Sequence, residues 1–443
     1  MPSVRQWMRR MVVFCASAMV RVYSSIQSPR LDYILQFLSE YFGKPFVRTD
    51  HSAGADVTYA VNVVSKVNLD PAGLLEERGL YRNEVPAARD PDGTWVLFPD
   101  DSSFGFDLFS AIFYLMARCE EYLAHPPDAF GRFPYTSSAA FHGGFLERPI
   151  VHEWLFRFSQ QLFGEGFIPP FRFLPTIDVD MAWSYRHKGF ARNAGGLLRS
   201  LLRRDGTAAE RIEVLRGQRQ DPFDAFTFLH EVHGRNGVHP HYFIHAGSKR
   251  NAFDKNIPLS NPAMQSLVRD LSRSSTVGLH PSWASGDDPS LLLEEKSALA
   301  SVLGAPVSSS RQHFIRMKLP DTYRALIAAG ITDDYSMGYG SINGFRASVA
   351  VPFYWYDLER DEQTTLRVHP FCFMDANALF EQKQDAAQTE AELAQYVETF
   401  RKWGGTFVSV WHNSYLGSAR AYAGWPELYA SFLRTEDSND SRR

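Results

Sequence analysis

The stretch Phe171-Arg172-Phe173-Leu174-Pro175-Thr176-Ile177-Asp178-Val179-Asp180 decides the fold, because an apolar run ends there in two carboxylates. Its first half predicts a strand. Side chains two residues apart on a strand point to the same side, so Asp178 and Asp180 are expected to face one pocket at the strand's carboxyl end. Two like charges this close repel each other unless a cation or a shared proton relieves them. The pair therefore indicates a metal ligand beside a general base, although aspartate also caps helices and turns the chain.

Strand-like and helical segments alternate along the chain after Gly166. Repeated βα units imply a parallel sheet, either open or closed into a barrel. About seven strands over roughly 265 residues favour a (β/α) barrel, in which functional residues lie at the carboxyl ends of the strands. The expected strands are 171–179, 241–245, 276–279, 306–310, 331–334, 365–373 and 406–411, and the expected helices between them include 262–273, 289–303, 320–329 and 385–403.

The later strand-like segments also end in ionisable residues. A single histidine at such a place is more often structural than a ligand. Five strand ends that each carry a histidine, aspartate or arginine indicate a shared site instead. The residues concerned are His280, Arg311, His313, Arg346, Asp375 and His412.

The chain divides into a smaller α/β domain at 29–168 and the barrel-like region at 169–435. Helical periodicity in the first domain is clearest at 106–123 and 150–163. Nothing in this domain assembles a recognisable catalytic set. We expect residues 1–28 to be a disordered extension and residues 436–443 a disordered tail.

Composition excludes several classes of protein. The 443 residues carry a net charge of −4, which gives no electrostatic basis for binding nucleic acid. Cys15, Cys119 and Cys372 are far apart and form no C-x-x-C pair, which fits a reducing compartment and a cytoplasmic protein. The apolar run 11–20 follows arginines and superficially resembles a signal peptide, but it is too short to span a bilayer. No transmembrane segment is expected elsewhere.

Two charged segments lie outside the strand-end pattern. Residues 186–219 are strongly basic and helical in pattern, between the first and second strands. They are compatible with docking to an anionic glycan or a membrane surface, but a solvated helical insertion is the interpretation we favour. In the first domain Arg118, Glu120 and the segment 128–132 could form a polar network, and there we favour a solvated helix end. The arginines of the basic segment include Arg199, Arg203, Arg204, Arg211, Arg216 and Arg219.

The ordered set of strand-end residues resembles the polysaccharide deacetylases of the NodB-homology class, carbohydrate esterase family four. The resemblance covers residues 170–435. It implies a distorted (β/α) barrel that binds a divalent metal ion, zinc, and removes N- or O-linked acetyl groups from a carbohydrate substrate. Residues 29–168 resemble an uncharacterised amino-terminal domain found ahead of such deacetylase domains in some bacteria.

The metal ligands follow from this resemblance. The family's first motif has a base aspartate followed by a ligand aspartate, which makes Asp178 the candidate base and Asp180 the candidate ligand. The second motif supplies two histidine ligands spaced i, i+4; His280 fits the first, but the second position is Ala284. Because a zinc site needs three protein ligands, His313 is the candidate for the third, and it could equally be structural.

The resemblance assigns the other catalytic roles as well. Arg346 looks like the arginine that pairs with the base aspartate, and Arg311 is a rival for that role. Asp375 corresponds to a carboxylate that supports the catalytic histidine, and His412 is the candidate general acid. The candidates for stacking on sugar faces are Trp183, Trp283 and Trp411, each of which could equally be core packing.

Three functions are compatible with these residues. The leading one is a metal-dependent deacetylase acting on a bacterial polysaccharide or a sugar-bearing intermediate. The second is a catalytically inactive, deacetylase-like glycan-binding protein that lost its metal, which Ala284 favours. The third is a metal-dependent amidase that acts on a substrate other than a sugar.

Overall fold

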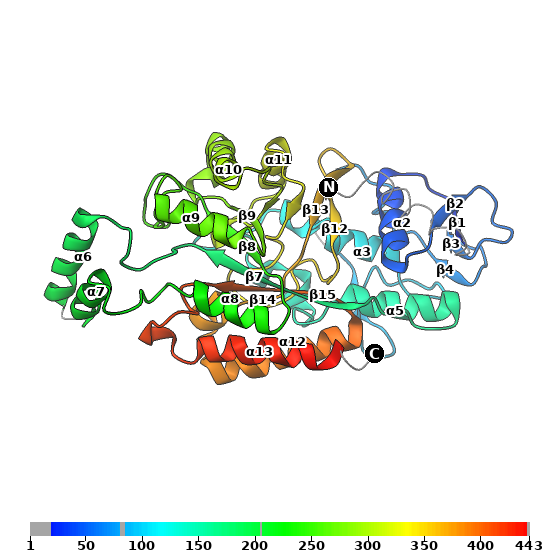
Figure 1. Ribbon diagram of the computed structural model, residues 1–443. Helices are drawn as coiled ribbons and strands as arrows, with labels where there is room; N and C mark the ends of the chain where they lie inside the picture. The colour runs from blue at the N-terminus through cyan, green and yellow to red at the C-terminus, as the bar shows by residue number, and fades with distance from the viewer. Residues whose placement is uncertain (1–18, 80–84, 204–205, 441–443) are drawn as a thin grey trace. The chain divides into compact units, whose positions relative to one another are not determined.

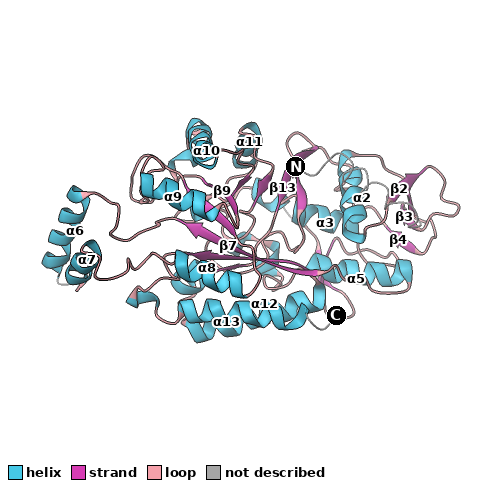
Figure 2. Cartoon of the chain, in the orientation of Figure 1, coloured by secondary structure: helices cyan, strands magenta, loops and turns pink. Residues whose placement is uncertain are grey.

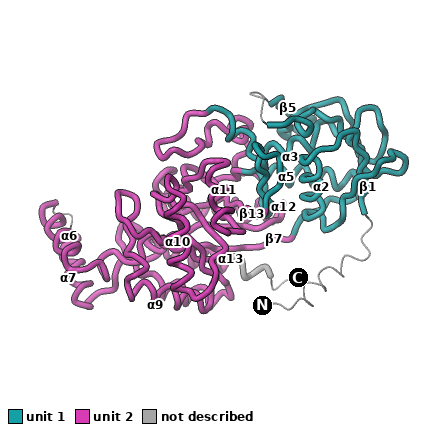
Figure 3. Tube along the Cα trace, turned by 90° about the horizontal axis from the view of Figure 1, so that it is seen from above, with its two compact units in different colours: residues 1–124, 149–169, 347–364 teal, residues 125–148, 170–346, 365–443 magenta. Residues whose placement is uncertain are grey.

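The computed structural model describes residues 19–79, 85–203 and 206–440, which form two compact units (Figure 3). The sequence analysis expected one contiguous boundary after residue 168. Instead, residues 125–148 belong to unit 2 and residues 347–364 belong to unit 1. The local sequence pattern of a connecting segment does not show where that segment packs. Unit 1 is made of Met1–Ala124, Pro149–Pro169 and Ala347–Thr364, and unit 2 of His125–Arg148, Pro170–Arg346 and Thr365–Arg443.

Unit 1 contains a parallel sheet with the strand order β2-β1-β3-β4 (Figure 1). Strand β1 lies within the stretch that we expected to be a disordered extension, so that expectation was wrong for residues 20–24. The strands are β1 (Val20–Ser24), β2 (Phe46–Thr49), β3 (Val57–Tyr59) and β4 (Val67–Leu69), with the antiparallel pair β5 (Ala87–Arg89) and β6 (Trp95–Leu97) and the later strand β12 (Phe353–Asp357).

The helices of unit 1 begin and end at residues that favour those positions. Helix α2 (Pro29–Phe42) has Ser28 as its N-cap, with a side chain that accepts from the backbone N–H of Leu31. It ends at Gly43, whose φ of 62° is the left-handed conformation that glycine adopts without strain. The other helices are α3 (Leu108–Met116) and α5 (Ile150–Phe163).

The charged cluster after α3 is buried, so the expected solvated helix end was wrong. Arg118 is 0% exposed and donates to Glu120 at 2.6 Å and to Glu121 at 2.7 Å. Both carboxylates are buried as well. Burial of three charges is tolerable here because the guanidinium satisfies two carboxylates at once.

Unit 2 is built on a parallel sheet in which the paired strands follow the order β13-β11-β10-β9-β8-β7-β15-β14. Strands β13 and β14, at the two ends of this order, do not pair with each other among the described residues, so a closed barrel of seven strands is not shown. The strands are β7 (Phe171–Val179), β8 (His241–His245), β9 (Thr276–His280), β10 (Ser309–Ser310), β11 (Asp333–Asp334), β13 (Glu362–Val368), β14 (Phe373–Met374) and β15 (Gly405–His412).

Helices flank this sheet, as Figures 1 and 2 show. Helices α9 and α10 pack on β9, helix α12 packs on β15, and α13 contacts both α12 and α8. Helix α10 begins at Pro289 after the N-cap Asp288 and ends before Gly304, as its sequence predicts. The helices are α4 (Ala139–His142), α6 (Phe190–Arg203), α7 (Thr207–Leu215), α8 (Phe226–Arg235), α9 (Pro262–Leu271), α10 (Pro289–Leu303), α11 (Asp321–Ala328), α12 (Ala386–Trp403) and α13 (Trp425–Asp440).

Four remaining expectations concern the termini, the membrane and the cysteines. Cys15 and residues 11–18 of the apolar run lie outside the described residues. Helix α13 extends to Asp440, into the segment expected to be a disordered tail. None of the helices in the described part of the chain is both long and apolar enough to cross a bilayer. Cys119 and Cys372 are buried free thiols.

Candidate functional site

A pocket of about 320 Å³ opens at the carboxyl ends of the strands in unit 2. One part of its wall is ionisable and contains Asp178, Asp180, His280, His313 and His412. Another part is aromatic and contains Phe130, Phe314, Phe380 and Tyr415. The strand ends that the sequence analysis singled out therefore contribute to one site.

Strand register brings these residues together. On the pair β7–β15, His412 is the partner of Asp178, and on the pair β8–β9, His280 is the partner of His245. Strand β10 pairs with β9 at Ser310, and its chain continues into the short helical turn His313–Ile315. Because all these strands are parallel, their carboxyl ends meet at the same edge of the sheet.

Asp178 is held by an arginine from β10. Nη1 of Arg311 donates to Oδ1 of Asp178 at 2.8 Å and to the hydroxyl of Thr176 at 2.7 Å. Both side chains of this ion pair are buried, since Arg311 is 0% exposed and Asp178 is 2% exposed. The other carboxylate oxygen, Oδ2, lies 3.9 Å from Nε2 of His280. Asp178 is thus fixed in orientation by one oxygen, while the carboxylate lines the pocket.

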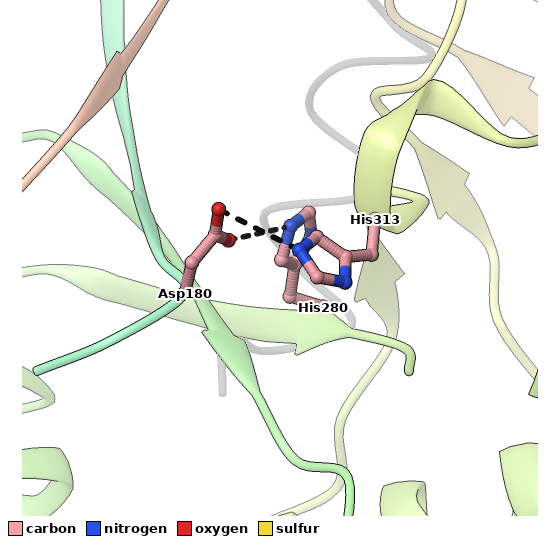
Figure 4. A group of neighbouring side chains, drawn as sticks. All are labelled: Asp180, His280 and His313. Carbon is pink, nitrogen blue, oxygen red and sulfur yellow. Dashed lines mark ion pairs between the residues drawn. The ribbon is translucent and has the colours of Figure 1, made fainter. Parts of the chain in front are cut away.

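Asp180, His280 and His313 form a compact group whose possible ligand atoms all lie within 4.8 Å of one another. Nε2 of His280 is 3.1 Å from Oδ1 of Asp180, and Nε2 of His313 is 3.5 Å from Oδ2. Figure 4 shows both imidazoles directed at the same carboxylate. One carboxylate and two imidazoles match the ligand set of a catalytic zinc site with an open position.

The tautomer of His280 is fixed by its backbone partner. Nδ1 of His280 lies 2.6 Å from the carbonyl oxygen of Arg311. A carbonyl only accepts, so Nδ1 carries a proton and Nε2 is the ring nitrogen that faces Asp180. Nε2 lies 3.1 Å from the carboxylate, and either a proton on this atom or a cation between the two atoms makes the contact favourable.

His313 is oriented by Asp254, a residue that the sequence analysis missed. Oδ1 of Asp254 lies 3.2 Å from Nδ1 of His313 and 2.9 Å from Nε2 of His245. Burial raises the pKa of this carboxyl, but the hydrogen bonds from His245 and His313 hold it well below its usual range. A carboxylate behind a ligand imidazole is a common way to orient it toward a metal. His245, Asp254 and His313 form a second group of ionisable side chains beside the first.

The residues fit a bound cation. Oδ1 of Asp180 is buried and accepts no hydrogen bond from the described residues. Burial raises the pKa of Asp180, but His313, His280 and His412 together bring it well below its usual value. Burial lowers the pKa of His313, and Asp180 and Asp254 raise it to about 9. Without a metal, His313 therefore holds a proton between two carboxylates, and a metal ion would replace that proton.

His412 and Asp375 form a second buried pair at the pocket. Nδ1 of His412 is 2.6 Å from Oδ1 of Asp375, whose Oδ2 accepts from the backbone N–H of His412 at 2.6 Å. Burial lowers the pKa of His412, but Asp375, followed by Asp180 and Asp178, raises it to about 10. Its Nε2 lies 3.6 Å from Asp180. The imidazole is therefore protonated near neutral pH and faces the ionisable wall.

Two sequence predictions require correction. Arg311, the alternative, occupies the position beside Asp178, whereas Arg346 donates to the carbonyl of Gly338 at 3.0 Å and lies over the ring of Tyr339. Trp411 is fully buried and its indole N–H donates to Ser409, so it cannot stack on a ligand.

The other two tryptophans, Trp183 and Trp283, also do not line the pocket. Trp183 is buried and donates to Asp224 at 3.2 Å. Trp283 stacks on Phe253 with ring centroids 4.0 Å apart. Both tryptophans flank the motifs in sequence, but their rings are engaged in packing within unit 2.

The aromatic wall comes partly from a segment that we had assigned to the first domain. Phe130 stacks on Phe314 with centroids 5.5 Å apart. Phe314 has a φ of 58°, a conformation that is costly for an aromatic residue. Arg132 holds that backbone, because its Nη1 donates to the carbonyls of Phe314 at 2.8 Å and of Gly340 at 2.9 Å. The Asp128–Arg132 ion pair, at 2.7 Å, was visible in the sequence as a polar segment, but the contacts of Arg132 with Phe314 and Gly340 elsewhere in unit 2 were not.

Comparisons with known proteins cover both parts of the chain. Residues 20–165 match a family of unknown function, DUF7033. No curated protein matches the chain. Among solved structures, the chain is similar to a Mycobacterium smegmatis protein assigned as a polysaccharide deacetylase, with 14% identity, a TM-score of 0.39, and coverage of 62% of this chain and 90% of that one.

Two further solved structures are similar at lower TM-scores. A family 4 carbohydrate esterase from Streptomyces lividans, solved in complex with acetate, has 11% identity, a TM-score of 0.27, and coverage of 61% of this chain and 91% of that one. A polysaccharide deacetylase from Bacillus cereus has 10% identity, a TM-score of 0.27, and coverage of 60% and 88%. Identities and TM-scores this low do not indicate a function, so the function proposed below is argued from the residues of the pocket.

Proposed function

We propose that unit 2 is a metal-dependent hydrolase that removes an N- or O-linked acetyl group from a bacterial polysaccharide or a sugar-bearing intermediate. The observation that carries this proposal is the convergence of Asp180, His280 and His313, with Nε2 of each imidazole directed at the carboxylate. The resemblance of the strand-end motifs to carbohydrate esterase family four supplies the reaction class.

The chain's own residues suit each chemical step. A zinc ion held by the three ligands would supply Lewis-acid polarisation of an acyl carbonyl and lower the pKa of a water molecule. Asp178 is the base that takes the proton of the attacking water, and the ion pair with Arg311 holds its carboxylate in orientation. Only one of its oxygens is used by Arg311, which leaves the other for the proton.

His412 is the acid of this proposal. Asp375 holds its Nδ1 and raises its pKa, so the imidazole carries the proton that a departing amine or alkoxide needs. The proton lies on Nε2, the atom nearer to Asp180. Acid and base are therefore separate residues, each held by its own buried partner, Asp375 for His412 and Arg311 for Asp178.

A sugar substrate is supported by the aromatic wall rather than by the tryptophans. Phe130, Phe314, Phe380 and Tyr415 offer apolar faces next to the ionisable wall. Rings of this kind stack on the C–H faces of a sugar, while the polar groups bind its hydroxyls. The inactive alternative depended on Ala284, and the position of His313 beside Asp180 and His280 supports the enzyme instead, because this residue would complete a set of three ligands.

The test is metal content together with acetate release. Purified protein is analysed for metals, and acetate is measured with acetylated chito-oligosaccharides and with a non-sugar N-acetyl amide. We expect one zinc per chain and acetate from the sugar. Asp180→Asn should lose both properties, whereas Asp287→Asn, which changes an exposed carboxylate paired with Arg316, should retain them.

The outcomes separate the three candidate functions. Absence of metal from both the wild type and the variants, even after incubation with zinc, contradicts the hydrolase and favours the glycan-binding protein. Metal with acetate released only from the non-sugar amide favours the amidase.

A further inference from the structure

Helix α6 exposes a continuous apolar face. Phe190 is 90% exposed, Leu202 77%, Leu198 60% and Leu201 59%. Phe190, Leu198 and Leu202 are spaced by eight and four residues, so they share one face of the helix, and Leu201 lies beside them. Exposed side chains of this size normally occur singly on a protein surface, and a contiguous set indicates an interaction site.

This face is exposed because α7 packs on a different face of α6. Ser200 bonds to Thr207 at 2.7 Å, and Arg211 donates to Asn193 at 3.0 Å. A Cβ on Gly196 would lie 2.6 Å from the Arg211 guanidinium, so glycine at this position allows the close approach. The side chains of Asn193 and Ser200 thus find hydrogen-bond partners within the hairpin formed by α6 and α7, whereas the exposed leucines of α6 do not pack on α7.

The hairpin is firmly attached to unit 2. The buried carboxylate of Asp221 accepts from the backbone N–H groups of Ser184, Tyr185 and Arg186 at 2.7, 2.7 and 2.9 Å. This bonding ties the chain entering the insertion to the chain leaving it. Arg211 also lies over the ring of Tyr185, 4.5 Å from its centroid. The segment is thus the helical, largely exposed insertion that the sequence favoured, and its exposed leucines belong to an ordered helix.

Within α6, Phe190–Arg203, the charged side chains all have one sign. Helix α6 contains no acidic residue, and Arg192, Arg199 and Arg203 form a stripe at spacings of seven and four residues. Burial and then the neighbouring cations Arg250 and Arg211 lower the pKa of Arg192 to about 10. The acidic residues of α7 are matched separately, since Glu210 and Glu213 face Arg219 at 3.2 and 3.9 Å.

We propose that the apolar face of α6 inserts into the surface of an anionic lipid membrane and that the arginines beside it bind the lipid headgroups. A helix with leucine and phenylalanine on one face and arginine on another is the usual form of such an interfacial segment. A second copy of this chain is a poorer occupant, because it would bring two arginine stripes together. An anionic glycan would use the arginines and leave the leucines in water.

The test is flotation of the full-length protein with vesicles. We expect the protein to float with vesicles of phosphatidylcholine and phosphatidylglycerol, not with phosphatidylcholine alone, and to be released by added salt. Leu198→Glu with Leu202→Glu should weaken binding by about tenfold or more, because two buried side chains are lost from the interface. Leu293→Glu, on α10 and 51% exposed, is the matched control and should bind as the wild type does.

Other results overturn the proposal. Failure of the wild type to float with anionic vesicles excludes it, as does unchanged flotation of the double variant. A dimer in light scattering that the double variant dissociates, without vesicle binding, assigns the face to self-association. Retention on a polyanionic glycan without vesicle binding assigns the segment to a glycan. Circular dichroism melting of each variant verifies folding, and none of these readouts depends on the proposed hydrolysis.

Discussion

Two buried charged clusters in this chain differ in how completely their charges are satisfied. In unit 1, Arg118 donates to Glu120 and Glu121 at 2.6 and 2.7 Å, and none of these three side chains has a buried polar atom without a hydrogen bond. In unit 2, Asp180 lies among His280 and His313, yet its Oδ1 accepts no hydrogen bond from the described residues.

The difference is why we propose a bound metal ion at the second cluster and not at the first. A buried carboxylate that lacks a donor costs free energy unless something outside the chain binds it. In the Arg118 cluster the guanidinium supplies donors for both acids. In the Asp180 cluster Oδ1 has no donor among the described residues, and a cation held by the three side chains would satisfy it.

Replacement of Arg118 should have the largest effect on stability. Arg118→Met leaves two buried carboxylates without their cation and should lower the free energy of unfolding of unit 1 by roughly 3–5 kcal/mol. Urea denaturation followed by fluorescence measures this change. Arg235→Met removes an exposed pair with Glu231 and should change stability by less than about 1 kcal/mol. A small effect of Arg118→Met would mean that the cluster is not what stabilises this region.

Replacement of His313 should abolish function with little cost in stability. His313→Ala should remove the metal and reduce acetate release by roughly 10²–10³-fold, because two protein ligands do not hold zinc tightly. The free energy of unfolding of the metal-free protein should change far less than in Arg118→Met. His230→Ala, on the exposed surface of α8, is the control. Full zinc occupancy in His313→Ala would contradict the ligand assignment.

Replacement of Asp375 should move the pH dependence of hydrolysis. A general acid works in its protonated form, so activity persists below the pKa of His412, about 10, and is lost above it. Asp375→Asn removes the main group that raises this pKa. The alkaline limb of kcat/KM should then shift toward neutral pH, with a fall in kcat of about 10²-fold. If the alkaline limb lies at the same pH in both proteins, a group other than His412 is responsible for it.

Replacement of Asp254 should have the smallest effect. Asp254→Asn keeps the shape of the residue but loses the charge behind His313, and we expect a loss of about 10–100-fold in zinc affinity. Competition with a chelator measures the affinity. Asp270→Asn, an exposed carboxylate on α9, should leave it unchanged. Equal zinc affinity in the two variants would mean that Asp254 contributes to packing and does not support His313 as a ligand.

The sequence predicted local elements well where periodicity and caps agree. Strands β7 and β8 and helices α5 and α10 have the bounds that their patterns indicate, because Gly, Pro and Asp mark the ends of the helices. The short strands β10 and β11 were predicted too long. The pattern shows an apolar run but not how much of it pairs with a neighbouring strand.

The candidate site was predicted in part. The aspartates and histidines of the pocket wall were each identified at a strand end, since strand ends follow from the alternation of segments, whereas Arg132 and Glu381 were not identified as site residues. The choice of Arg311 beside Asp178 depended on the pairing of β10 with β9, which no local pattern reveals. Asp254 and Phe130 were missed because they lie on connecting segments that reach the site only in three dimensions.

The sequence by itself determined that Asp178 and Asp180 point to one side, because side chains on a strand alternate with a period of two. It also determined that the basic segment 186–219 is helical. Only the tertiary structure decided that His313 lies beside Asp180 and His280, and that α7 covers the polar face of α6 rather than its leucines. Spacing along the chain fixes the direction of a side chain, but its partner depends on which strands and helices become neighbours.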